Sequence, residues 1–277
     1  MPILLRLLAL AMVFLPLALL PWAAQAVSLD PRPVTLPGPD GLALQALLLL
    51  PEATVPGIPV IALHGCAGLA ARDGSIRLGA RERDWATRLL AAGHPVLFPE
   101  SFLSRGLGTA CGVTDFPAGG AVRGGDALAA AAWAQAQPWA APGGALLLGW
   151  SHGGTTVLAA AATAPPGLLR GGVAFYPGCG PSRRARTEAQ VPLLLLLGAR
   201  DDWTPPAPCR GWAAMQAAGR VELEEFPTAG HGFDAPGNAP PRARDLPDGR
   251  RVTAGADPAA RAVAIPRAMA FFEQLSR

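Results

Sequence analysis

The stretch GALLLGWSHG at residues 144–153 decides the fold of this chain. Its apolar half predicts a buried strand, and the alanine-rich run that follows, 155–164, predicts a helix. A G-x-S-x-G pattern between a buried strand and a helix is typical of a nucleophile elbow, a sharp turn that exposes one reactive side chain. Only small residues fit two positions before and after the serine, and Gly149 and Gly153 meet that demand. The pattern therefore predicts a nucleophilic Ser151 above a helix N-terminus.

Apolar and amphipathic segments alternate on both sides of this stretch. The expected strands are 58–63, 94–98, 145–149, 172–176, 191–197 and 221–226, after an initial hairpin of 34–36 and 42–51. The expected helices are 81–92, 125–135, 209–218 and 258–276, besides the helix that follows Ser151. Strands that are apolar throughout, each followed by a helix, indicate an α/β protein with a mostly parallel sheet and helices on both faces.

Two further local signals concern the ends and the connections of these elements. Asp257 precedes Pro258 and is the expected N-cap of the last helix. The segments 101–123 and 237–255 are rich in glycine, proline or charge, and they are expected to be loops. The first of them is long enough to shape a substrate entrance.

The N-terminal 26 residues have the pattern of a signal peptide. A short start that contains Arg6 precedes an apolar stretch, and the small-x-small sequence Ala24-Gln25-Ala26 then predicts cleavage before Val27. An uncleaved membrane anchor is the alternative, although Pro16 and Pro21 interrupt the stretch. The expected protein is therefore exported, to the periplasm or outside the cell, with no membrane attachment after cleavage.

Length and charge restrict what the mature chain does. Of 277 residues, removal of 26 leaves 251, which suits a single α/β domain at 27–277. The formal charge of +3 becomes +2 without Arg6, so electrostatics favours neither nucleic acid nor an acidic membrane as a partner. The chain contains no lysine, since all 23 residues of the combined Lys and Arg count are arginine. This excludes a Schiff base or a Ser–Lys dyad.

Four cysteines remain in the predicted mature chain. An even number in an exported protein indicates disulfides, and we expect the pairs Cys66–Cys111 and Cys179–Cys209 because each would join two loops at the same edge of the sheet. Four free buried thiols are the alternative. The spacings match no zinc pattern, so neither a metal nor a cofactor is expected.

A nucleophilic serine needs a base, and the chain contains four histidines. His94 begins a strand and so lies at the wrong edge of the sheet, while the side chain of His152 leaves the elbow in another direction. His64 ends a strand, where an architectural role is expected. His231 follows the last strand between two glycines, on a loop that reaches over Ser151. By elimination, His231 is the predicted base.

The histidine in turn needs a carboxylate that fixes its tautomer. Asp201 and Asp202 both follow the strand at 191–197, and carboxyl ends of parallel strands carry the reactive groups of such sheets. We predict Asp201 as the acid and expect Asp202 to cap the next helix or pair with an arginine. The reverse assignment stays open at this point.

Two backbone N–H groups are expected to form an oxyanion hole. One belongs to His152, directly after the nucleophile. The other belongs to Cys66, on the loop after the strand at 58–63, where Gly65 permits the required turn. These groups predict acyl transfer in two steps, in which an acyl-serine forms and water then releases the acid.

Taken together, these motifs resemble the dienelactone hydrolase family. The resemblance covers about Val34 to the C-terminus and rests on His64-Gly65-Cys66-Ala67-Gly68-Leu69, Arg105-Gly106, Gly149-Trp150-Ser151-His152-Gly153-Gly154, Gly198-x-x-Asp201 and Gly230-His231-Gly232-Phe233, in the family's order. It implies an α/β-hydrolase fold without a large cap domain, and hydrolysis of a small ester or lactone. The chain order serine, acid, histidine is also that of α/β-hydrolases.

The chain departs from the family at two positions. The founding enzymes have a cysteine where this chain has Ser151, and the glutamate that helps to activate that cysteine has no counterpart beside His64-Gly65-Cys66. Dienelactone itself is therefore not the expected substrate. By analogy with the family, Arg105 is expected to bind a substrate carboxylate, with a solvated loop arginine as the alternative.

Aromatic residues beside the motifs are the expected walls of the site. They are Phe102, Trp150, Trp203 and Phe233, and packing in the core is the alternative for each. The leading hypothesis is an exported serine hydrolase acting on small carboxylic esters or lactones. A peptidase of the same fold and a non-catalytic binding protein are the alternatives.

Overall fold

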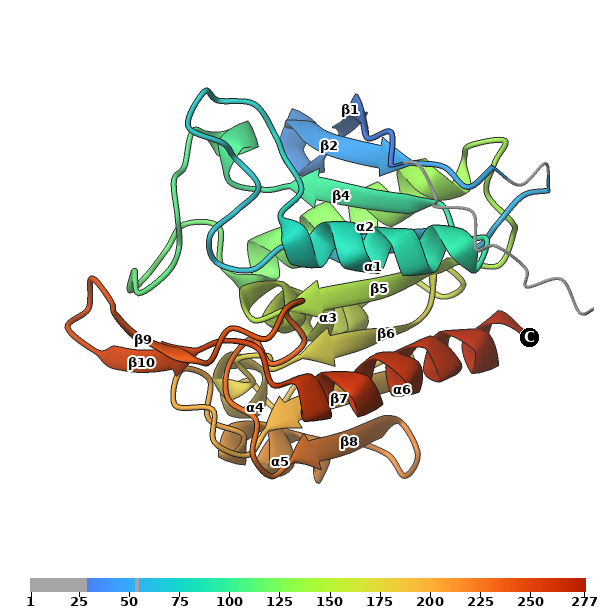
Figure 1. Cartoon of the computed structure of the whole chain (residues 1–277). Coiled ribbons are helices and arrows are strands. Elements are labelled where there is room, and N and C mark those ends of the chain that lie inside the picture. The colour runs from blue at the N-terminus through green and yellow to red at the C-terminus, as the bar shows by residue number, and fades with distance from the viewer. Residues whose placement is uncertain (1–28, 53–54) are drawn as a thin grey trace, which may run out of the picture.

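The computed structural model describes residues 29–52 and 55–277, whose centre is an eight-stranded sheet (Figure 1). The strand order is β1-β2-β4-β3-β5-β6-β7-β8. β2 runs antiparallel to both β1 and β4, and the strands from β4 to β8 are parallel to one another. The bounds are β1 Arg32–Pro37, β2 Ala43–Leu49, β3 Val60–Leu63, β4 Val96–Glu100, β5 Ala145–Trp150, β6 Leu169–Phe175, β7 Leu193–Gly198 and β8 Val221–Phe226.

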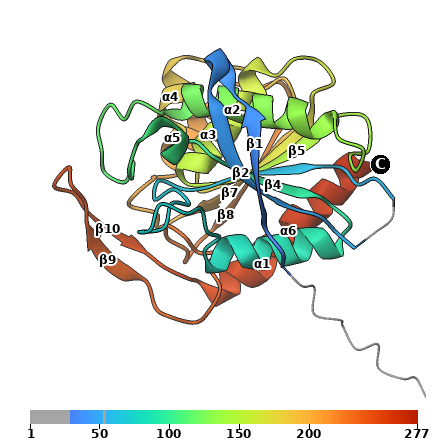
Figure 2. The same cartoon turned by 90° about the horizontal axis from the view of Figure 1, so that it is seen from above.

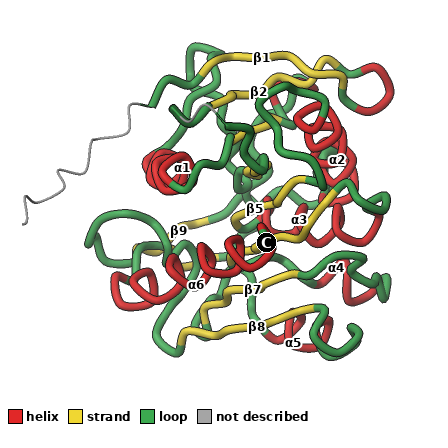
Figure 3. Tube along the Cα trace, turned by 90° about the vertical axis from the view of Figure 1, so that its right-hand side faces the viewer, coloured by secondary structure: helices red, strands yellow, loops and turns green. Residues whose placement is uncertain are grey.

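Helices cover both faces of this sheet (Figures 2 and 3). One face carries α1 and α6, and the other carries α2, α3, α4 and α5. The bounds are α1 Ala80–Ala91, α2 Gly120–Gln135, α3 His152–Thr163, α4 Gly180–Arg184, α5 Ala207–Ala213 and α6 Pro258–Ser276, with 3-10 turns η1 Pro39–Gly41 and η2 Leu103–Arg105. Each face buries its own apolar cluster, because strands that are apolar throughout supply side chains to both.

The α/β-hydrolase fold expected from the sequence is confirmed, and the described residues contain no large cap domain. Most predicted elements occur within a few residues of their expected positions. α2 begins five residues earlier than expected, α5 is shorter than the predicted 209–218 helix, and α4 was not expected at all. Asp257 caps α6 as predicted, since its carboxylate accepts the N–H groups of Ala259 and Ala260 at 3.1 and 3.0 Å.

The segment 237–255 differs most from its expected structure. It contains a second, two-stranded sheet, β9 Arg242–Asp245 and β10 Arg251–Ala254, which protrudes beside the carboxyl ends of the main strands (Figures 1 and 2). Its strands are rich in arginine and mostly exposed, so they lack the apolar signal of a strand. The segment 101–123, in contrast, is largely loop up to the start of α2.

The nucleophile elbow joins β5 to α3, as the sequence predicts. Ser151 has the strained dihedrals φ 56° and ψ −116°. A Cβ atom at Gly149 would lie 2.3 Å from the carbonyl oxygen of Gly153, and one at Gly153 would lie 1.9 Å from that of Leu63. Neither approach is compatible with a larger residue, so both glycines are sterically required for this turn.

Both predicted disulfides, Cys66–Cys111 and Cys179–Cys209, are present. Disulfides persist in oxidising compartments, so they indicate an oxidising environment for this protein. The predicted signal peptide, residues 1–26, lies outside the described residues. Within the part of the chain that the structure describes, no helix has the length and apolar character needed to cross a membrane.

Candidate active site

The structure brings together the three residues predicted as a catalytic set. Ser151 follows β5, Asp201 follows β7 and His231 follows β8, so all three lie at the carboxyl edge of the sheet. His231 Nε2 lies 2.9 Å from Ser151 Oγ, and His231 Nδ1 lies 2.8 Å from Asp201 Oδ2. Each residue is at most 8% exposed. A serine, a histidine and a carboxylate in this relay are arranged for proton transfer from the hydroxyl.

The Asp201 carboxylate is held by the residues that follow it. Its Oδ1 accepts the backbone N–H groups of Trp203 and Thr204 at 2.9 and 2.8 Å, and its Oδ2 accepts the Thr204 hydroxyl at 3.0 Å. Because a carboxylate only accepts hydrogen bonds, His231 carries its proton on Nδ1 and donates it to Asp201. Its Nε2 then accepts the hydrogen bond of the Ser151 hydroxyl. Thr204 was not predicted from the sequence, where it is one of many loop threonines.

Asp202, the alternative acid, points elsewhere. Its Oδ1 accepts the backbone N–H of Thr253 at 2.8 Å and so ties the loop after β7 to β10. The sequence prediction that it caps a helix or pairs with an arginine is therefore wrong. That hydrogen bond depends on the β9–β10 hairpin, which the sequence pattern did not predict.

The two amides predicted for an oxyanion hole lie beside Ser151. The N–H of His152 is the first of α3 and has no acceptor within the helix. Among the described residues, neither this N–H nor that of Cys66 has a hydrogen-bond acceptor. The Cys66 loop is close to the nucleophile, since a Cβ at Gly65 would lie 3.9 Å from Ser151 Cβ. Both donors are thus available to a ligand.

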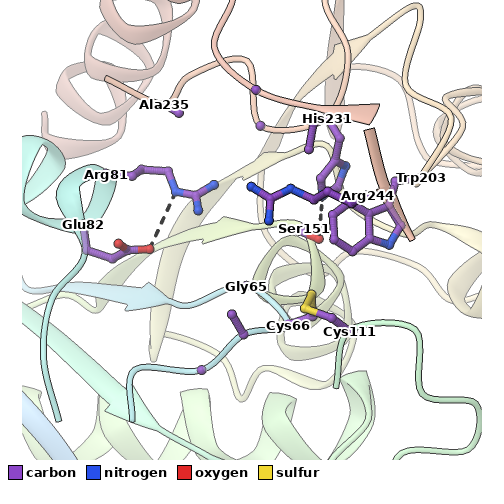
Figure 4. Close-up of a pocket in the computed structure, with 15 residues that line it drawn as sticks. Gly65, Cys66, Arg81, Glu82, Cys111, Ser151, Trp203, His231, Ala235 and Arg244 are labelled. Carbon is purple, nitrogen blue, oxygen red and sulfur yellow. Dashed lines mark hydrogen bonds and ion pairs between the residues drawn. A yellow bond between two sulfur atoms is a disulfide. The ribbon is translucent and has the colours of Figure 1, made fainter. Parts of the chain in front are cut away.

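Two cavities meet at Ser151, with volumes of about 300 and 460 Å³. Ser151, Trp203 and the Cys66–Cys111 disulfide line both of them, and Figure 4 shows these residues around the smaller one. The smaller cavity extends towards α1 and His231, and the larger one towards the loop 110–116 and the N-terminus of α2. Both also touch the β9–β10 hairpin.

The smaller cavity carries two arginines, Arg81 and Arg244, which point into it from opposite sides (Figure 4). Arg81 donates a hydrogen bond of 2.6 Å to the Tyr176 hydroxyl, and that hydroxyl donates to the buried carboxylate of Asp234. Glu82 lies 3.6 Å from Arg81 Nε. Sequence reasoning missed both arginines, since Arg81 begins a helix and Arg244 lies on the unpredicted hairpin.

Arg105, in contrast, does not reach either cavity. It makes two hydrogen bonds, of 2.8 and 2.7 Å, to the carboxylate of Asp126, which is 1% exposed. A third bond joins it to the carbonyl of Ser101. The expected substrate contact of Arg105 is thus replaced by an internal ion pair that joins η2 to α2. The sequence does not show this pairing, because 21 positions separate the two residues.

Of the four aromatic residues expected to line the site, the structure places only Trp203 there. Trp150 and Phe233 are fully buried in the core on the α1 and α6 side of the sheet. Phe102 is 1% exposed and packs edge-on against His64, at 4.8 Å between ring centroids. For these three, packing in the core describes the structure, because each ring is buried in a cluster of apolar side chains.

His64 has the architectural position that the sequence suggests. It is fully buried, and its Nδ1 lies 2.8 Å from the carbonyl oxygen of Gly65. Burial holds the pKa of His64 well below its usual value, so the ring is neutral, while burial raises the pKa of the nearby Glu100 carboxyl. Among the described residues, no group of three or more His, Cys, Asp or Glu side chains is placed to hold a metal ion.

Comparisons with known proteins identify the family and support the fold. A model of the dienelactone hydrolase family matches residues 44–276. A candidate dienelactone hydrolase from Klebsiella pneumoniae has a similar structure, with a TM-score of 0.65 and 21% identity, over 89% of this chain and 99% of that one. A search of curated proteins finds no match.

Two further solved structures show the range of the fold. A lidless α/β serine hydrolase from Xanthomonas campestris is 26% identical, with a TM-score of 0.52, over 73% of this chain and 86% of that one. A puromycin-hydrolyzing peptidase from Mycobacterium tuberculosis is 20% identical, with a TM-score of 0.52, over 74% of this chain and only 37% of that one. A protein described as a serine hydrolase and one described as a peptidase thus share this architecture.

Proposed function

The chain belongs to the dienelactone hydrolase family, and on that premise we propose that it is an exported serine hydrolase that cleaves a small carboxylic ester or lactone. One observation carries the proposal. The relay Ser151–His231–Asp201 is continuous, with 2.9 and 2.8 Å between the bonded atoms, and it opens on two cavities. A relay of this kind supports an acyl-serine intermediate.

The proposed reaction proceeds by two attacks on one carbonyl carbon. His231 Nε2 takes the hydroxyl proton as Ser151 Oγ attacks, and the N–H groups of Cys66 and His152 stabilise the oxyanion. The imidazolium, paired with Asp201, then donates that proton to the leaving alkoxide. Water, deprotonated by His231, attacks the acyl-serine, and the imidazolium returns that proton to Ser151 Oγ as the bond to the acyl carbon breaks and the acid leaves.

The cavities favour a small substrate that carries negative charge. Their volumes, about 300 and 460 Å³, suit small organic molecules rather than a folded polypeptide. In the smaller cavity, Arg81 is already paired with Glu82 at 3.6 Å and with Asp234 at 3.9 Å. Arg244 lines the same cavity and pairs with no acidic side chain of the described residues, and guanidinium groups bind carboxylates well. We therefore expect an ester or lactone with an anionic group on that side of the scissile bond.

Export is proposed from two features that are independent of each other. Residues 1–26 have the signal-peptide pattern, and the two disulfides need an oxidising compartment. On this proposal the mature protein is the single domain 27–277, in the periplasm or outside the cell. Its N-terminal residue would then be Val27, which mass spectrometry of the exported protein measures directly.

Peptide hydrolysis is the second candidate. The peptidase from Mycobacterium tuberculosis shares the fold, but this chain covers only 37% of its length. A non-catalytic binding role is less well supported, because a pocket that only binds has no need of the hydrogen-bonded relay around His231.

An assay with three chromogenic substrates tests these functions. We expect hydrolysis of p-nitrophenyl acetate, a higher kcat/KM for the anionic p-nitrophenyl hemiglutarate, and no cleavage of alanine p-nitroanilide. Faster cleavage of the anilide than of either ester would establish the peptidase. Inactivity of the folded protein on all three would favour the binding role.

A further prediction concerns the Cys66–Cys111 disulfide. It joins the loop with the proposed oxyanion donor to the loop 106–119, and the Cys66 carbonyl also accepts the N–H of Ala110 at 2.8 Å. Loss of an oxyanion donor costs about 10²- to 10³-fold in kcat, and a loosened donor costs less. We therefore expect the double variant Cys66→Ser/Cys111→Ser to lose about 10-fold or more in kcat, measured with p-nitrophenyl acetate at a temperature where it stays folded.

The second disulfide provides the matched control. Cys179–Cys209 closes a segment of 30 residues against 45 for the first, so each stabilises the fold by about 4 kcal/mol in the loop-entropy model. It joins α4 to α5 and lines neither cavity. Cys179→Ser/Cys209→Ser should therefore lower Tm about as much as Cys66→Ser/Cys111→Ser does, and leave kcat nearly unchanged. Equal losses of kcat in the two double variants would contradict a specific role for Cys66.

A further inference from the structure

A buried arginine lies directly behind the nucleophile elbow. Arg123, on α2, is 0% exposed. One of its terminal nitrogens donates to His152 Nδ1 at 2.6 Å and the other donates to the backbone carbonyl of His64 at 2.8 Å. Its guanidinium also lies over the Phe102 ring, 5.0 Å from the centroid. Arg123 therefore sits between the elbow and the loop of the proposed oxyanion hole.

This contact determines the proton arrangement of the His152 ring. A guanidinium has only hydrogen-bond donors, so His152 Nδ1 must be the acceptor and cannot carry a proton. Burial, together with the charge of Arg123, lowers the pKa of His152 to about 4, so the ring is neutral at pH 7. The neutral ring then has its one proton on Nε2.

The Nε2–H group remains available for binding. In the described part of the chain, it has no hydrogen-bond acceptor. It is also absent from the fully buried polar atoms without a partner, so this nitrogen is accessible from the cavity side. His152 lines the larger cavity, next to Ser151. Phe102 and Phe116 contact the ring edge-on, with centroid distances of 5.8 and 6.5 Å. The ring is thus held by Arg123 on one edge and by aromatic rings beside it.

We propose that the side chain of His152 is a specificity-determining donor, whose Nε2–H binds a carbonyl, ether or hydroxyl oxygen on the part of the substrate that fills the larger cavity. The preferred ester or lactone then carries such an oxygen near the scissile bond. The role is separate from that of the His152 backbone N–H in the oxyanion hole. It rests on the proposed hydrolysis and specifies which substrates the site prefers.

Two carboxylates line the larger cavity, Asp248 and Asp115, and neither accepts a hydrogen bond from His152 Nε2. Asp248 lies 2.8 Å from Arg250 Nε and forms an ion pair with it across the tip of the hairpin. Asp115 is on the exposed loop before α2. An apolar substrate group against His152 would leave the N–H without a partner in a partly buried site, which costs free energy. The cavity therefore discriminates against substrates that lack the oxygen.

Kinetics with two pairs of near-isosteric esters tests the proposal. p-Nitrophenyl methoxyacetate and p-nitrophenyl butyrate differ by an oxygen in the acyl part, whereas 2-methoxyethyl acetate and butyl acetate differ by one in the alcohol part. For each pair, kcat/KM of the ester with the extra oxygen is divided by kcat/KM of its hydrocarbon counterpart. This ratio is compared among wild type, His152→Gln and His152→Leu. Comparison of ratios removes the intrinsic reactivity of each ester and any general loss of activity in a variant.

We expect the ratio for one pair to fall by about 2- to 12-fold in His152→Leu, the range for one hydrogen bond. In His152→Gln it should stay close to the wild-type ratio, since the amide nitrogen can donate from a similar position. Unchanged ratios for both pairs in His152→Leu would overturn this inference and leave the proposed hydrolysis standing. Inactivity of wild type on all four esters would overturn the proposed hydrolysis, and the inference with it.

A second measurement does not depend on activity or on the folding of a variant. ¹⁵N NMR of the imidazoles distinguishes protonated from unprotonated nitrogens, and His152→Gln assigns the signal among the four histidines. We expect His152 of the wild type to be protonated on Nε2 only, from pH 5 to pH 8. A proton on Nδ1 in this range would overturn the inference, because Nε2 would then be an acceptor.

Discussion

The Ser151→Ala variant should lose at least about 10⁴-fold in kcat and remain folded. The substitution removes the attacking atom, Oγ. It also removes a single hydrogen bond among the described residues, the one from Oγ to His231 Nε2, so the fold should be little affected. Intact-mass labelling with a fluorophosphonate measures the same property directly. In the wild type, Ser151 Oγ displaces fluoride from phosphorus and His231 accepts the hydroxyl proton, which gives a single adduct.

The control for this prediction is the double variant Ser151→Ala/His231→Ala. Residues that act as one unit are not additive, so it should be little slower than either single variant. Two results would show that another group supplies the nucleophile. One is an adduct on Ser151→Ala, and the other is a loss of kcat in the double variant equal to the product of the two single losses. A folded wild type that takes up no fluorophosphonate would remove the case for an activated serine.

The second large effect is expected for Asp201→Asn, at about 10⁴-fold in kcat. Asparagine has nearly the shape of aspartate but offers an amide group to His231 Nδ1. The amide nitrogen is a donor, so the imidazole would place its proton on Nε2 and could no longer accept the proton of Ser151. The imidazolium of the transition state would also lose its carboxylate partner, now 2.8 Å away.

Asp202→Asn is the matched control, with the same chemical change at the next position. Asp202 accepts the N–H of Thr253, and an asparagine side-chain oxygen retains that bond. Its kcat should therefore stay within about 2-fold of wild type, the range of a substitution outside the site. A larger loss for Asp202→Asn than for Asp201→Asn would contradict the assignment of the acid. The pair can be measured with the same ester at the same pH.

Much of the candidate site could be predicted because its signals are local. The elbow is encoded in the short segment Gly149–Gly153, since the tight turn excludes any side chain at both glycines. Each member of the predicted set follows an apolar strand, and parallel strands bring their carboxyl ends to one edge. The disulfide pairs followed from the same reasoning, because both of them connect loops at that edge.

The substrate-contacting residues could not be predicted in this way. Arg105 lies in a motif that resembles one of the family, but a buried carboxylate on α2, Asp126, binds it. Arg81 carries no motif, and its place in the cavity depends on Tyr176 and Asp234, which come from distant parts of the chain. A pattern along one segment does not contain such pairings.

The sequence by itself thus determined the strands of the main sheet, most of the helices, the position of the elbow, and Ser151 and His231 of the proposed relay. These features depend on burial and steric exclusion within segments of a few residues. Only the tertiary structure decided that Asp201 rather than Asp202 meets His231, that Arg81 and Arg244 rather than Arg105 face the smaller cavity, and that Arg123 sets the tautomer of His152. The physical reason is that hydrogen bonds and ion pairs select partners by distance and direction in space. Those partners meet only after the hairpin, α1 and α2 have packed around the sheet.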